Sequence, residues 1–241
     1  TPMAWMGLAG YCFQLYFDFW GYSRMAVGLG HMLGFSLPRN FDHPYAARTM
    51  TDFWRRWHIT LGAWFRDYVY IPMGGSRQGM PRTILNLLVV WLLTGIWHGS
   101  TWNFLLWGLL IFLLIALEKL GLGPFLERHR KVARVYMLLA IPLTWLLFAV
   151  PDVGQIGIYL TRLFPFFGGG IAVNRGDFLR YGKQFGLFLV LGFLLSSPWP
   201  ERIWVRIRSS AVGTAVCLLL FWVAVYYISV SVNDPFMYFS F

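Results

Sequence analysis

The 241-residue chain is unusually apolar: 58% of its residues are hydrophobic, only 12% are charged, and its mean hydropathy is +0.57. Soluble domains carry about 25% charged residues, so the composition excludes an ordinary soluble protein, a disordered chain and a collagen-like chain. The net charge is +10, yet no basic tail or nucleic-acid-binding motif accompanies it. We therefore expect an integral membrane protein whose basic residues meet lipid headgroups, and no nucleic-acid partner.

The first segment, residues 1–37, is predicted to be membrane helix. Only Asp18, Arg24 and His31 interrupt its apolar sequence. A helix needs about 20 residues to cross a bilayer. The segment is therefore long enough for one helix, or for two pieces broken near Gly21.

Residues 38–82 contain a mixture of arginines, aspartates and aromatic residues, which predicts an interfacial or re-entrant region. Thr51 is a plausible N-cap for a helix that continues past residue 65. Aromatic and aliphatic side chains recur along it at helical spacing, as expected for an amphipathic helix at the membrane surface. That face holds Trp54, Trp57, His58, Leu61, Phe65 and Tyr68.

Residues 83–117 contain no formal charge. A straight helix of that length would be about 52 Å long, beyond a hydrocarbon core of about 30 Å. We expect a break near Gly95 and Gly99, which flank His98. A charged loop is expected over 118–134, and residues 135–232 are expected to contain further membrane helices. The predicted fold class is an all-α, multi-pass transmembrane protein.

Two histidines are the strongest candidates for chemistry, because ionisable groups in apolar segments are costly. His98 lies within the uncharged run, where a neutral imidazole could accept a proton from a hydroxyl. His58 lies on the apolar face of the predicted amphipathic helix. Each histidine could instead be structural. No pair of histidines has the spacing of zinc ligands, so no metal is expected.

The arginines of the interfacial region have two interpretations that do not exclude each other. They could face solvent and lipid headgroups, or bind the phosphates of an acyl donor such as coenzyme A through bidentate contacts. Arg55 and Arg56 are the candidates nearest to His58 in sequence. Asp52 is predicted to pair with one of these two arginines at i+3 or i+4.

Between about residues 11 and 120 the chain carries an ordered set of motifs. They are Tyr16-Phe17-Asp18-Phe19 with Gly21-Tyr22-Ser23, Asn40-Phe41, Asp52-Phe53-Trp54-Arg55-Arg56-Trp57-His58, Trp64-Phe65-Arg66-Asp67-Tyr68, Ile71-Pro72-Met73-Gly74-Gly75 and Trp97-His98-Gly99. Together these motifs resemble the membrane-bound O-acyltransferase family. The Ile-Pro-x-Gly-Gly turn looks more like the bacterial alginate O-acetylation branch than the branch that D-alanylates teichoic acids, and residues 234–239 resemble the end of that first branch. Trp20 and Arg24 depart from the family pattern.

The resemblance implies a ring of tilted helices around a central cavity, with His98 as the catalytic histidine and His58 as the second histidine of the site. Family members usually have several more helices before the Tyr-Phe-Asp-Phe stretch, so we expect this chain to be a C-terminal portion. The other residues expected to shape the cavity or bind substrate are Trp57, Trp97, Trp102, Asn103, Arg55 and Arg56.

The expected function is transfer of an acyl group, most simply acetyl, from a thioester donor to a hydroxyl of an exopolysaccharide such as alginate. The donor would be acetyl-coenzyme A or an acyl carrier acting as co-substrate, with no permanently bound cofactor. By resemblance, a periplasmic or extracellular acetyltransferase partner could complete the transfer, and the location would be the bacterial inner membrane. A channel or transporter for an acyl carrier or solute is the alternative, and a structural subunit of a polysaccharide synthase is a third hypothesis.

Overall fold

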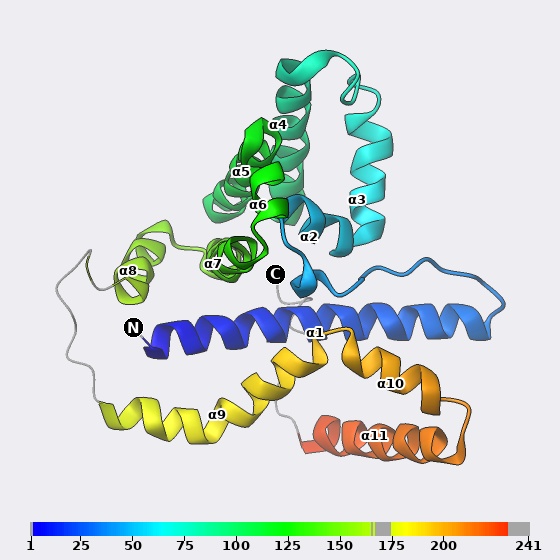
Figure 1. Cartoon of the computed structure of the whole chain (residues 1–241). Coiled ribbons are helices and arrows are strands. Elements are labelled where there is room, and N and C mark those ends of the chain that lie inside the picture. The colour runs from blue at the N-terminus through cyan, green and yellow to red at the C-terminus, as the bar shows by residue number, and fades with distance from the viewer. Residues whose placement is uncertain (1, 165, 167–174, 231–241) are drawn as a thin grey trace.

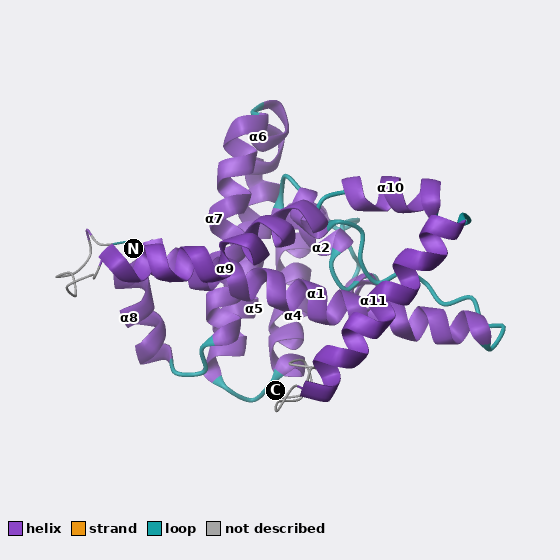
Figure 2. Ribbon diagram, turned by 90° about the horizontal axis from the view of Figure 1, so that it is seen from below, coloured by secondary structure: helices purple, strands orange, loops and turns teal. Residues whose placement is uncertain are grey.

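A computed structural model describes residues 2–164, 166 and 175–230, and within them every regular element is helical (Figures 1 and 2). Five described helices are long and apolar enough to cross a membrane. The expectation of an all-α, multi-pass protein is confirmed. The stretch 234–239, singled out for its resemblance, lies outside the described residues.

The first helix, α1 (Pro2–Met32), is continuous, so the alternative of a break near Gly21 is wrong. α1 runs across the middle of the molecule, between the helices that follow it and the last three helices (Figure 1). α1 is not among the five candidate spans found in the described residues, and the membrane crossing expected for residues 1–37 stays a prediction.

The interfacial region folds as several short helices instead of one amphipathic helix. The single turn η1 (Pro44–Ala46) precedes α2 (Met50–Arg56), α3 (Ile59–Phe65) and the π-helical turn η2 (Arg66–Tyr70). The predicted N-cap, Thr51, is also wrong, because Thr49 precedes α2 and its hydroxyl accepts a hydrogen bond from the Asp52 amide over 3.0 Å.

The uncharged segment breaks where the sequence predicted. α4 (Gly79–His98) ends at His98, and α5 (Trp102–Leu117) begins after a short connection. The two helices pack closely, because a Cβ at Gly95 would lie only 2.6 Å from the carbonyl oxygen of Phe104. The turn before α4 is tied to it by Asn86, which donates hydrogen bonds to the carbonyl oxygens of Met73 and Gly75.

The predicted charged loop over 118–134 is wrong, because this stretch is mostly helical. The π-helical turn η3 (Glu118–Leu122) and α6 (Gly123–Arg128) continue from α5, and α7 (Arg130–Ala149) follows at once. Glu118 is buried and hydrogen-bonded, which allows a carboxylate to lie inside the helical assembly.

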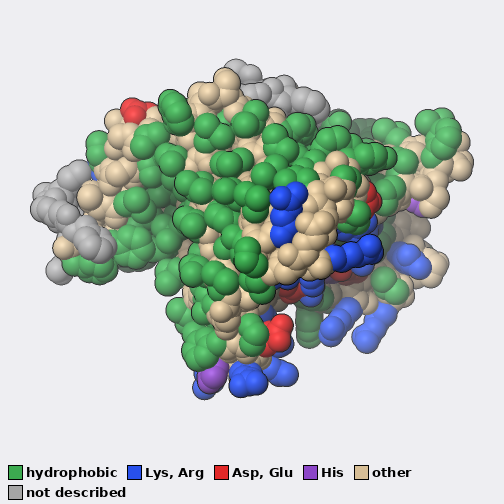
Figure 3. Space-filling model, turned by 90° about the horizontal axis from the view of Figure 1, so that it is seen from above, with side chains coloured by type: hydrophobic (Ala, Val, Ile, Leu, Met, Phe, Trp, Pro, Cys, Tyr) green, Lys and Arg blue, Asp and Glu red, His purple; other side chains and the backbone are tan. Residues whose placement is uncertain are grey.

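The core is formed by α1, α2, α4, α5 and α7, whose buried side chains make one aromatic-rich cluster. α8 (Val153–Leu163) packs on α1 and α7. α9 (Arg175–Leu195), α10 (Trp199–Ile207) and α11 (Ala211–Val230) lie on the other side of α1 (Figure 1). Viewed from above, hydrophobic side chains cover much of the visible face, and Lys and Arg gather on one part of it (Figure 3).

Candidate active site

A cavity of about 550 Å³ lies in the aromatic-rich half of the molecule. Both candidate histidines, His58 and His98, line it, although 40 positions separate them in the sequence. Side chains from α1, α2, α3, α4, α5 and α7 complete its wall. A volume of this size is typical of a small-molecule site.

His98 is the last residue of α4, and its ring is fixed by its own helix. Its Nδ1 lies 2.7 Å from the carbonyl oxygen of Thr94, one turn earlier. A carbonyl oxygen only accepts hydrogen bonds, so Nδ1 is the protonated nitrogen and Nε2 carries the lone pair. A backbone carbonyl oxygen therefore orients His98 so that its Nε2 can act as a base.

Aromatic rings surround His98. The centroid of the Trp107 ring lies 4.7 Å from that of His98, the Trp97 centroid 4.8 Å and the Phe148 centroid 5.4 Å. These three aromatic side chains therefore pack the imidazole in a largely apolar setting.

His58 lies at the junction between α2 and α3, where its backbone adopts the left-handed conformation with φ 48° and ψ 54°. That conformation is uncommon for residues other than glycine and marks a constrained position. It separates the two short helices and explains why the predicted continuous helix fails. Its Nδ1 lies 3.1 Å from Asn40 Oδ1.

Burial lowers the pKa of His58 to about 4, with a smaller effect in the same direction from His98. The imidazole is therefore neutral at neutral pH. The Trp97 ring is near both histidines, with its centroid 6.2 Å from that of His58 and 4.8 Å from that of His98.

The charged groups that line the cavity are all cationic. Arg55, Arg66 and Lys119 lie in its wall, and no carboxylate is present among the described lining residues. Arg66 is paired with the exposed Asp67, with Nε 2.7 Å from Oδ1. The balance of charge at the cavity favours an anionic ligand.

The remaining predicted site residues lie around the cavity in different roles. Trp57 lines the cavity. Arg56 is not in the lining and pairs with Asp52, with its Nε 2.9 Å from Oδ1. This i+4 contact is one of the two that the sequence predicted for Asp52. Trp102 is 73% exposed, and neither it nor Trp97 is in the lining. Substrate contacts by these residues stay predictions.

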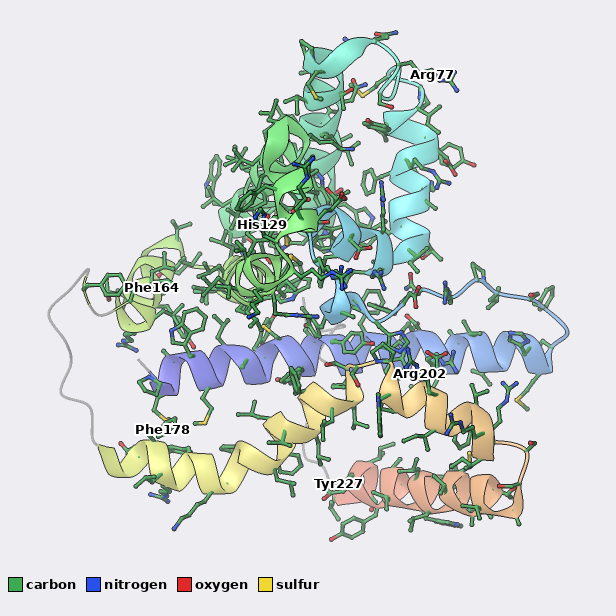
Figure 4. All side chains as sticks on the ribbon, viewed as in Figure 1. Arg77, His129, Phe164, Phe178, Arg202 and Tyr227 are labelled. Atoms are coloured by element: carbon green, nitrogen blue, oxygen red, sulfur yellow. The ribbon has the colours of Figure 1, made fainter. Side chains whose placement is uncertain are left out.

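Asn103 is fully buried and outside the cavity lining. Its amide nitrogen donates to the carbonyl oxygens of Leu147 and Phe148, which ties the start of α5 to the end of α7 beside His98. Arg77, at the outer end of the connection between η2 and α4, points away from the molecule (Figure 4) and is not in the lining.

Sequence reasoning missed several residues that form the site. Trp107 and Trp145 line the cavity from α5 and α7, and Thr94 fixes His98. The spacing of four residues between Thr94 and His98 was a readable signal, because i and i+4 share a helix face. The tryptophans gave no such signal, since aromatic residues are frequent throughout this chain.

Metal binding finds no support in the described part of the chain, where no group of three or more His, Cys, Asp or Glu side chains is arranged to hold an ion.

Comparison with known proteins agrees with the family motifs. A sequence model of the membrane-bound O-acyltransferase family matches residues 2–150. The chain is 34% identical to the probable alginate O-acetylase AlgI of Pseudomonas putida over 261 aligned positions, which cover all of this chain and 54% of that protein.

Two further relatives match shorter stretches. The peptidoglycan O-acetyltransferase of Helicobacter pylori is 51% identical over 107 residues, covering 44% of this chain and 20% of that protein. The teichoic acid D-alanyltransferase of Bacillus subtilis is 35% identical over 107 residues, covering 42% of this chain and 27% of that protein. The chain therefore spans about half the length, or less, of the curated relatives that it matches.

Proposed function

The chain belongs to the membrane-bound O-acyltransferase family, and from this premise we propose that it forms the active-site part of an enzyme that moves an acetyl group from a thioester to a polysaccharide hydroxyl. The observation that carries the proposal is the pair His58 and His98 in one cationic cavity, with Nε2 of His98 available as a base. The alginate O-acetylase match over the whole chain favours an exopolysaccharide such as alginate as acceptor.

In the reaction, Nε2 of His98 accepts the proton of the hydroxyl as its oxygen forms a bond to the thioester carbonyl carbon. The carbon–sulfur bond then breaks, and the leaving thiolate takes the proton from the imidazolium. Such general-base catalysis is worth about 10²–10⁴-fold in rate. The acceptor is the polymer itself or a partner acetyltransferase outside the membrane, and the protein is a multi-pass protein of the bacterial inner membrane.

The donor is the phosphate-bearing thioester acetyl-coenzyme A or an acyl carrier, used as co-substrate. Support comes from Arg55, Arg66 and Lys119 in the cavity wall, since cations favour phosphate groups. Replacing Arg55 with Gln should raise the KM for acetyl-coenzyme A about tenfold through the loss of a charge-assisted contact. Arg77→Gln, at the outer connection, serves as the matched control.

The test of the base assignment is His98→Ala in the full-length protein, with His31→Ala, at an exposed histidine, as control. Acetyl transfer from radiolabelled acetyl-coenzyme A should fall by about 10²–10⁴-fold in the first variant and stay unchanged in the second, at equal protein abundance. Transfer close to the wild-type rate in His98→Ala would exclude His98 as the base. Altered solute flux without any covalent transfer would support the channel alternative, and tolerance of alanine at both His58 and His98 would support a structural subunit.

A further inference from the structure

Asn40, in the loop before α2, binds the segment that carries His58. Its side-chain Oδ1 lies 3.1 Å from His58 Nδ1, 2.9 Å from Thr60 Oγ1 and 3.3 Å from the Thr60 amide nitrogen. Its backbone carbonyl oxygen accepts a hydrogen bond from the Ile59 amide over 3.0 Å. One residue therefore contacts three consecutive residues at the junction of α2 and α3.

These contacts fix which way the Asn40 amide faces. The backbone N–H of Thr60 can only donate, so the Asn40 atom opposite it must be the carbonyl oxygen. The amide nitrogen then faces Ser23 on α1, and Nδ2 donates to Ser23 Oγ over 3.2 Å. The donor at Thr60 and the acceptor at Ser23 are therefore both satisfied by one orientation of the Asn40 amide.

The orientation of Asn40 decides the tautomer of His58. An amide oxygen only accepts, so His58 Nδ1 must carry the proton and donate it to Asn40. The other ring nitrogen, Nε2, then has the lone pair. The pKa of His58, lowered to about 4 chiefly by burial, agrees with a neutral ring of this kind.

Asn40 also supports the unusual backbone at His58. The left-handed conformation, with φ 48°, is maintained only where surrounding contacts determine it. The hydrogen bond from the Ile59 amide to the Asn40 carbonyl and the contacts of Thr60 hold the residues that follow His58. Ring and backbone of His58 therefore depend on the same residue.

We propose that Asn40 is a positioning residue that holds His58 as its Nδ1–H tautomer, so that His58 meets the substrate through Nε2 as a hydrogen-bond acceptor. The inference deepens the proposed acyl transfer and rests on it for the identity of the substrate. The substrate group opposite His58 must then carry an N–H or O–H. Neutral His58 does not donate a hydrogen bond to the acyl oxygen.

The direct test is nuclear magnetic resonance of the full-length protein labelled with ¹⁵N-histidine, which reports which ring nitrogen carries the proton. We expect the His58 resonances, assigned by their loss in His58→Asn, to show Nδ1–H and bare Nε2. A wild-type ring protonated at Nε2 would overturn the proposal. This measurement does not depend on catalytic activity.

Variants of Asn40 and of its neighbour Thr60 give a second, independent measurement. Asn40→Ala should leave a mixture of tautomers, whereas Thr60→Val, which keeps the contact between Asn40 and His58, should leave the wild-type tautomer. Retention of pure Nδ1–H in Asn40→Ala would contradict the positioning role. If Asn40→Ala does not fold, the wild-type spectrum and the aspartate variant below still decide.

Asn40→Asp separates positioning from mere structural support. The carboxylate still accepts from Thr60 and His58, and the Ser23 hydroxyl can turn to donate to it. The new negative charge beside Nδ1 should raise the pKa of His58 by about 1 to 3 pH units, measured in the same spectra, against the opposing influence of nearby His98. The acid limb of acetyl transfer should move to higher pH with it.

A His58 pKa unchanged in Asn40→Asp would overturn the proposal, because the charge would then not reach the ring. The outcomes also distinguish the proposed acyl transfer from the proposed positioning role of Asn40. The expected tautomer and pKa change without any acetyl transfer by the wild type would refute the proposed function alone, whereas transfer with an Nε2–H ring would refute only the role of Asn40.

Discussion

His58 and His98 are held by different chemistry at the scale of single residues. His98 is oriented by a carbonyl of its own helix, through Thr94, whereas His58 depends on Asn40 from a distant loop. Both arrangements leave Nε2 as the nitrogen with the lone pair. A single cavity therefore contains two neutral imidazoles able to accept hydrogen bonds.

The lowered pKa of His58 predicts loss of stability in acid. The folded protein binds a proton at His58 only near pH 4, whereas the unfolded chain binds it near pH 6.5. Protons therefore favour the unfolded state between these values, and the melting temperature should fall as pH decreases from about 6.5 to 4.

The melting temperature of the His58→Asn variant should fall less steeply over the same pH range, because asparagine tolerates the left-handed backbone and does not titrate there. Melting curves of the detergent-solubilised protein measure the difference. His129→Asn, at an exposed histidine, should behave as the wild type does. Parallel curves for the wild type and His58→Asn would show that His58 is not held neutral by the fold.

The short helix α2 is anchored by another element. Glu118, the first residue of η3, accepts hydrogen bonds from the amides of Met50 and Thr51 over 2.6 and 2.9 Å. It also accepts from the Thr51 hydroxyl over 2.6 Å and from the Tyr136 hydroxyl of α7 over 3.0 Å. The helix dipole favours a carboxylate at a helix N-terminus. Glu118 therefore stabilises the position of α2, the helix that precedes His58.

Glu118→Gln should lower the free energy of unfolding by about 1 to 3 kcal/mol, because charge-assisted hydrogen bonds to buried groups are lost. Denaturant or thermal unfolding in detergent measures this change in the free energy of unfolding. Glu127→Gln, on the exposed face of α6, should change it by less than about 0.5 kcal/mol. Equal stability of the two variants would show that Glu118 does not anchor α2.

The crossing of α4 and α5 requires small residues. A Cβ at Gly108 would overlap the carbonyl oxygen of Trp91, and backbone cannot move aside as a flexible side chain can. Gly108→Ala should therefore destabilise the protein by about 1 to 3 kcal/mol. Gly28→Ala, in α1 with no atom within 4 Å, should instead be neutral or stabilising, since alanine favours helix. Similar unfolding midpoints for both variants would argue against this close packing.

At the scale of the whole molecule, the five apolar helices determine where the protein resides. In the most apolar 18-residue stretch of each helix, 44% of α7 is buried inside the protein but only 6% of α11, which exposes apolar residues along its length. Such a surface is stable against lipid, and a helix satisfies its own backbone hydrogen bonds there. Washing membranes with alkaline carbonate should therefore leave the protein in the pellet. Its release into the supernatant would mean that it is only peripherally attached.

Much of this organisation could be predicted from the sequence. The uncharged run of residues 83–117 was too long for one span, and the helices do break beside His98. The two histidines in apolar surroundings do lie in one cavity. The break at His58 could not be predicted, because a periodic apolar pattern is the same for one helix and for two short ones.

Sequence by itself determined the membrane class and the candidate histidines, because both depend on composition and local spacing. Only the tertiary structure decided which residues support them, since Asn40 and His58 are 18 positions apart and Glu118 and Met50 are 68 apart. Hydrogen bonds at such separations arise from how helices pack. No local pattern encodes them, so the amide that fixes one histidine and the carboxylate that anchors its helix become visible only in the folded chain.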